Sequence, residues 1–170
     1  MDHYRRTVPA MEQRVPRWVR LGMVVALAAP QLVVGLWAVL APRSWFDSFP
    51  GLDPRLVAAE PPFNAHLATD AGAGFLATGI ALLVAALIAR RGAVYVSLAT
   101  YAAFAVPHAL YHAINPAPGL TGGEDLLNVL VLASGIVMAA VLAWGAWAPS
   151  PAREPRSRVT RPDHGVRLPG

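Results

Sequence analysis

The stretch that decides the fold is "LATDAGAGFLATGIALLVAALIA", residues 67–89, in which Asp70 is the only charged side chain. A helix rises about 1.5 Å per residue, and about 20 apolar residues cross the hydrocarbon core of a bilayer. Three further runs have this length and character, at residues 21–41, 93–114 and 126–147. Transmembrane β-strands would instead alternate apolar and polar residues. The runs therefore predict an all-α fold, an integral membrane four-helix bundle.

The composition agrees with a membrane protein. Hydrophobic residues make up 55% of the 170 residues, charged residues 14%, and the mean hydropathy is +0.44. No cysteine is present, which excludes disulfides, thiolate metal sites and covalent haem attachment. The sequence also lacks nucleotide-binding glycine motifs, a serine nucleophile elbow and nucleic-acid-binding signatures, so we expect no nucleic-acid partner.

The arginines predict the orientation. All fourteen basic residues are arginine, and only Arg43 and Arg55 lie outside the segments before the first run, between the second and third, and after the fourth. Because positive charge marks the cytoplasmic side, both termini are predicted to be cytoplasmic. The exclusive use of arginine suggests a bacterial genome rich in G and C, so we expect the bacterial cytoplasmic membrane. The pI of about 10.3 then follows from the arginines that are predicted to face the cytoplasm.

Three segments follow from this pattern. Residues 1–20 form a basic cytoplasmic segment, residues 21–148 the four-span domain, and residues 149–170 a cytoplasmic tail rich in arginine and proline. The first run is longer than the roughly 7–15 apolar residues of a cleaved signal, so we interpret it as a membrane span. The tail contains few large apolar residues and is expected to be disordered, near anionic headgroups.

Polar residues gather at the predicted outer ends of three spans. Residues four apart lie on one face of a helix, as do the two histidines of "PHALYHA", residues 107–113. Polar groups within a span are costly unless they are paired or functional. The candidate ligand-binding residues are Asn64, His66, Asp70, Tyr101, His108, His112, Asp125 and Asn128.

One interpretation of this cluster is a metal centre. Imidazole and carboxylate groups suit zinc or iron, and the candidate ligands are His66, Asp70, His108 and His112. The chain would then be a metal-dependent membrane enzyme acting on a lipid-like substrate. "HALYH" lacks the glutamate that follows the first histidine in zinc proteases, so no general base accompanies the motif. Haem b held by His66 with His108 or His112 is a further alternative.

A second interpretation needs no metal, and we rank it first. A few convergent polar groups in an apolar cavity suffice to bind a lipid-like or quinone-like molecule in a binding or accessory role. The third interpretation is an interhelical hydrogen-bond network in a subunit of a larger membrane complex. Whether the protein is an enzyme stays open. The expected partners are the lipid bilayer, a small amphipathic ligand and a membrane protein.

Two local features affect the shape of this region. Pro30 and Gln31 in the first run predict a kink that leaves a freed carbonyl group and an amide facing the other helices. The outer loop at residues 42–65 contains Trp45, Phe46 and Phe49, which predicts either a lid over the pocket or an aromatic anchor in the headgroup region.

Four motifs carry a resemblance to known proteins: "PRSWFDSFPG", "FNAHLATDAGAGFLATGIAL", "PHALYHA" and "DLLNVLVL". With them, residues 20–148 resemble uncharacterised small four-helix bacterial membrane proteins, and the layout is similar to that of DoxX-like proteins. This resemblance implies the fold and no catalytic residue. The histidines and aspartates are also similar to the zinc ligands of ceramidase-type and progestin-receptor-type membrane hydrolases, which have seven helices where this chain has four.

Overall fold

A computed structural model describes residues 9–147. The described chain is helical, which confirms the all-α prediction, and its pairing of extended backbone is limited to one isolated bridge between Arg14 and Arg90. The elements, in order, are η1 (Ala10–Glu12), α1 (Arg17–Gly22), the π-helical η2 (Met23–Ala28), α2 (Ala29–Leu40), α3 (Pro42–Ser48), α4 (Ala65–Ile88), α5 (Arg91–Ile114) and α6 (Gly122–Trp147).

Four helices in the described part are long and apolar enough to cross a membrane. The first comprises α1, η2 and α2, and the others are α4, α5 and α6. Side-chain caps place two of the helix starts before the apolar runs. Asn64 accepts a hydrogen bond from the backbone N–H of Leu67, and Glu124 accepts one from that of Thr121.

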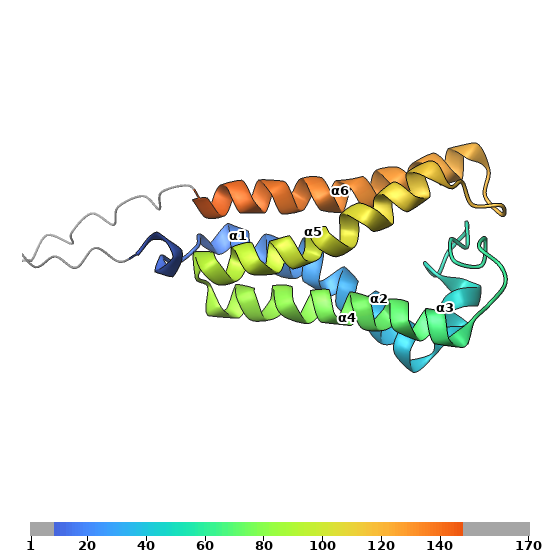
Figure 1. Cartoon of the computed structure of the whole chain (residues 1–170), viewed down its shortest axis with the longest axis horizontal. Coiled ribbons are helices and arrows are strands. Elements are labelled where there is room, and N and C mark those ends of the chain that lie inside the picture. Colours follow the sequence, from blue (N-terminus) through green and yellow to red (C-terminus); the bar gives the residue numbers. More distant parts are fainter. Residues whose placement is uncertain (1–8, 148–170) are drawn as a thin grey trace, which may run out of the picture.

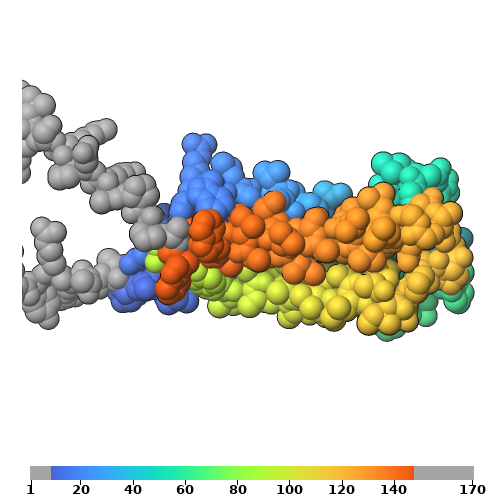
Figure 2. Space-filling model, turned by 90° about the horizontal axis from the view of Figure 1, so that it is seen from above, coloured from blue at the N-terminus to red at the C-terminus, as the bar shows by residue number. Residues whose placement is uncertain are grey.

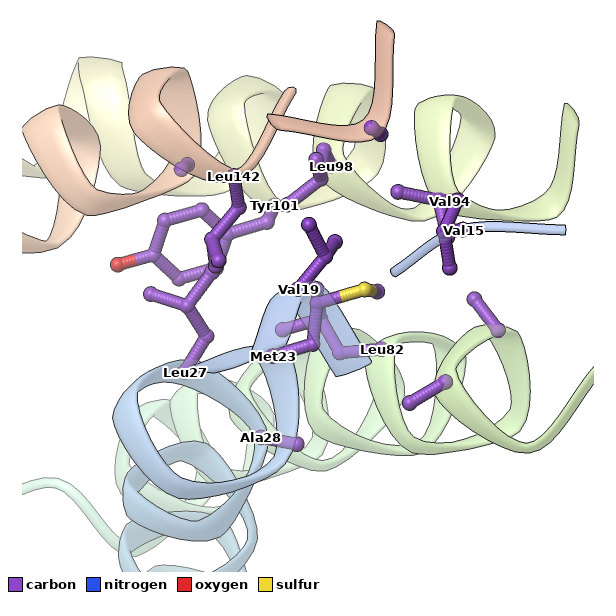
Figure 3. Close-up of a cluster of buried hydrophobic side chains, with 14 of the residues drawn as sticks. Val15, Val19, Met23, Leu27, Ala28, Leu82, Val94, Leu98, Tyr101 and Leu142 are labelled. Carbon is purple, nitrogen blue, oxygen red and sulfur yellow. The ribbon is translucent and has the colours of Figure 1, made fainter. Parts of the chain in front are cut away.

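The main hydrophobic core lies toward the end of the molecule where the described chain begins and ends (Figure 3). Its fully buried side chains include Val19, Met23, Leu82 and Leu142, which come from the first span, α4 and α6. The N-terminal segment closes this end over the turn between α4 and α5. The backbone N–H of Val15 donates to the carbonyl of Ala89, which has a left-handed φ of 59°.

The other end of the molecule is more open. Figure 1 shows α2 running beside α4 and α5 running beside α6, with the two pairs diverging toward α3 and the loop that follows it. Within the described chain, the α2 backbone packs on α3, α4 and η2 but not on α5 or α6. The space between the two pairs is where a cavity can form.

Prolines lie where two of the helices change direction. Pro30 has no N–H to donate to a carbonyl one turn earlier, and the preceding turns are the π-helix η2, in which the N–H of Ala29 donates to the carbonyl of Val24. Pro107 lies inside α5, which bends toward α6 in its second half (Figure 1). The predicted irregularity at Pro30 and Gln31 therefore takes the form of a π-helical segment.

Two glycines allow α2 to pack closely on α4. A Cβ atom added at Gly35 would lie 2.7 Å from the backbone nitrogen of Leu76, and one added at Gly72 would lie 2.8 Å from Cβ of Ala38. Small residues allow this kind of close backbone approach between helices in membranes. The packing of α2 on α4 therefore depends on the absence of side chains at both positions.

We expect Gly72→Ala to destabilise the protein by about 1–3 kcal/mol, because neither the α2 backbone nor Ala38 can yield without separating the helices. The thermal unfolding midpoint in detergent measures this. Gly123→Ala is the matched control, since no atom lies within 4 Å of a Cβ at that position. Equal midpoints for the two variants would contradict the close packing.

Candidate functional site

A cavity of about 440 Å³ lies between the two helix pairs. Its wall includes residues of the first span, α3, the loop after α3, α4, α5 and α6. The volume falls within the range of about 300–1,000 Å³ that is usual for small-molecule sites. The wall is mainly apolar and contains a few polar side chains, so it resembles an amphiphile-binding site in composition.

A satisfied polar network forms one part of the wall. Gln31 of α2 places its side-chain oxygen 3.2 Å from the hydroxyl oxygen of Thr78 in α4, and it is hydrogen-bonded to the hydroxyl of Tyr101 in α5. Gly135 of α6 leaves room for this hydroxyl, because an added Cβ would collide with it. The network joins three helices.

The two histidines of "PHALYHA" lie in the wall beside aromatic rings. His108 stacks on Phe104 with ring centroids 5.7 Å apart, and its ring meets that of Phe75 edge-on at 6.0 Å. The rings of His108 and His112 are 4.9 Å apart at an interplanar angle of 83°. Both histidines line the cavity, as the four-residue spacing predicts.

The loop at residues 42–65 covers the cavity. Trp45 from α3, together with Phe49, Leu56, Val57 and Glu60 from the segment that follows, lines it. Trp45 is 7% exposed, and its ring lies 6.1 Å from that of Phe49. This position is the one that the prediction of a lid requires.

Three buried polar atoms in this wall have no hydrogen-bond partner. They are Nε1 of Trp45, Oε1 of Glu60 and Nδ1 of His112. Leaving a buried donor or acceptor unpaired costs about 1–3 kcal/mol, so buried polar atoms nearly always have partners. These three come from α3, the loop and α5, and they all belong to residues that line one cavity. These atoms themselves are closed off from solvent, so other atoms of the same residues form the cavity wall.

The cavity reaches the surface along α6. Val131, which is 61% exposed, and Ser134, also exposed, both line it. The α2 backbone does not pack on that of α6 within the described chain, and residues of both helices line the cavity. Figure 2 looks onto α6, with the first span along one of its sides and the loop at the end of the molecule.

Four of the predicted site residues line the cavity, namely Tyr101, His108, His112 and Asn128. The others do not. Asn64 caps α4, and Asp125 is buried and accepts a hydrogen bond from the N–H of Ala117 at 3.3 Å. His66 and Asp70 form a pair 3.3 Å apart on the surface of α4, with side chains 81% and 60% exposed.

The predicted metal ligands are thus divided between two places. His66 and Asp70 lie on the surface of α4, whereas His108 and His112 line the cavity. Among residues 9–147, no three histidine, cysteine, aspartate or glutamate side chains are grouped as a metal site. The same separation leaves His66 without a shared space in which to hold haem b together with His108 or His112.

Several wall residues could not be found by helical spacing. Gln31 was expected to face the other helices, but Trp45 was expected only as part of a lid or an anchor, and Glu60 and Ser134 were not expected at the site. Glu60 lies in a segment without regular structure, where no periodicity predicts the direction of a side chain. Ser134 lies about two turns after Asn128 on α6, and a single serine in an apolar span is only a weak indication of a binding site.

Comparisons with known proteins add no identity. No protein-family model matches the chain, and neither does any curated protein or solved structure. The resemblance to DoxX-like proteins therefore stays a prediction.

The close approach of the Tyr101 hydroxyl to Gly135 can be tested by a double-mutant cycle. Gly135→Ala should destabilise the protein by about 1–3 kcal/mol, because the new Cβ collides with the Tyr101 hydroxyl. Tyr101→Phe alone should cost about 1 kcal/mol through loss of the hydrogen bond to Gln31. In the double variant the clash is absent. Its loss in free energy of unfolding should therefore be smaller than the sum of the losses in the two single variants. Strict additivity would show that the two residues do not meet.

Proposed function

We propose that this protein binds a lipid-like or quinone-like amphiphile from the membrane in the cavity under the outer loop, in a binding or accessory role. The observation that carries the proposal is one largely apolar cavity of about 440 Å³ whose wall also contains a few polar side chains, among them His108, His112 and Asn128. A headgroup could form hydrogen bonds with these side chains. The apolar part of the molecule would pack against the aromatic and aliphatic wall.

The separation of α2 from α6 supports entry from the bilayer. Both helices belong to spans that are apolar enough to cross a membrane, so an opening between them would face lipid along part of its length. A headgroup could enter while its alkyl chain stayed among the lipid chains.

The binding role is tested by filling the cavity. Ala71 of α4 lines it, whereas Ala73 on the same helix is exposed and does not. Gently solubilised wild-type protein and Ala73→Phe should retain a co-purifying amphiphile, measured by native mass spectrometry. Retention should fall by about tenfold or more in Ala71→Phe, because the new ring occupies the site. Equal retention by both variants would contradict binding in this cavity.

We further propose that the four spans form a four-helix bundle in the bacterial cytoplasmic membrane, with both termini in the cytoplasm. The arginine-rich segments before the first span and between α4 and α5 support this orientation through the positive-inside rule. The outer loop and its cavity would then face away from the cytoplasm.

This topology is testable because the chain has no native cysteine. A membrane-impermeant maleimide added to intact cells should label Ser48→Cys and Gly122→Cys, which lie at the outer loops. Gly92→Cys, near the α4–α5 turn, should react only after the membrane is permeabilised. The reverse pattern would invert the topology.

A further inference from the structure

The charge of the cavity wall restricts the headgroup it can accept. Glu60 is the only aspartate, glutamate or arginine among the wall residues that the structure describes, and the sequence contains no lysine. A phosphate or carboxylate headgroup would enter a wall with no arginine to neutralise it and would lie close to a carboxylate. Burying like charges together is strongly unfavourable. The wall therefore selects against anionic amphiphiles.

The carboxylate of Glu60 indicates which hydrogen bonds a headgroup must make. An ionised carboxylate accepts hydrogen bonds and donates none. An ammonium group carries up to three N–H donors and no acceptor, so it is the complementary headgroup. Its bond to Glu60 would be charge-assisted, and such bonds are roughly twice as strong as neutral ones.

Aromatic rings stand on two sides of the same space. Trp45 belongs to α3 and Phe49 follows it, whereas Phe75 and Phe104 belong to α4 and α5, with ring centroids 4.9 Å apart in the second pair. The faces of aromatic rings attract cations through their quadrupoles, most strongly in tryptophan. A wall with one carboxylate and several aromatic rings is suited to an organic cation.

From these observations we propose that the ligand is an amphiphile with a primary amine headgroup. Its ammonium group pairs with the carboxylate of Glu60 and lies among the aromatic rings of the wall. This inference rests on the proposed binding function and narrows it to one chemical class. The alkyl chain leaves through the opening between α2 and α6, where Val131 is exposed.

The test compares three probes that share one alkyl chain, namely dodecylamine, dodecanol and dodecanoate. Each is added to the full-length protein in neutral detergent at matched mole fractions, and occupancy is read by native mass spectrometry. Dodecylamine should bind about tenfold more tightly than dodecanol, and dodecanoate should bind most weakly. Glu60→Gln should remove the preference for the amine over the alcohol, because its side chain has no charge.

Asp70→Asn is the matched control, since it also removes a carboxylate but on the exposed surface of α4. It should keep the full preference for the amine. An unchanged preference in a folded Glu60→Gln variant would overturn the assignment to Glu60. If Glu60→Gln fails to fold, the ranking of the three probes on the wild-type protein still decides the headgroup class.

The outcomes separate this inference from the function on which it rests. Dodecanol or dodecanoate binding as tightly as dodecylamine, with binding lost in Ala71→Phe, would overturn the amine assignment and leave the cavity as a binding site. No binding of any probe, together with no co-purifying amphiphile, would overturn both.

Discussion

The close approach of α2 and α4 at Gly35 and Gly72 is the contact on which the rest of the structure depends. With no side chains between them, the two backbones pack directly, and α2 lies against α4 along its length. The α2 backbone therefore does not also pack on α6. The π-helical segment before Pro30 directs α2 away from the other pair, and the bend of α5 after Pro107 carries α5 with α6. The cavity forms because α2 stays with α4 while α5 stays with α6.

Polar groups in the resulting space fall into two kinds. Gln31, Thr78 and Tyr101 bond to one another and join three helices, which suits a structural role. Trp45, Glu60 and His112 each carry a buried atom with no partner. Helices in lipid gain little from hydrophobic association and hold together through packing and polar contacts, so the first kind stabilises the packing of the helices.

Helical spacing identified part of this site and misplaced the rest, for a geometric reason. His108 and His112 share a face with Tyr101, and that face turns inward. On α4, Asp70 and Gly72 are two residues apart, about 200° around a helix with 3.6 residues per turn. Since Gly72 packs on α2, Asp70 points outward together with His66. The sequence shows which residues share a face but not which face is buried.

The sequence by itself determined the all-α fold and the four apolar spans, because length and hydropathy are local properties of the chain. It also determined that His108 and His112 share one face of a helix, because helical spacing alone decides this. Only the tertiary structure decided which helices pair, where they diverge, and that Trp45 and Glu60 of the loop meet His112 of α5 across one cavity. Those contacts join residues far apart in the chain, and their geometry depends on how all the helices pack at once.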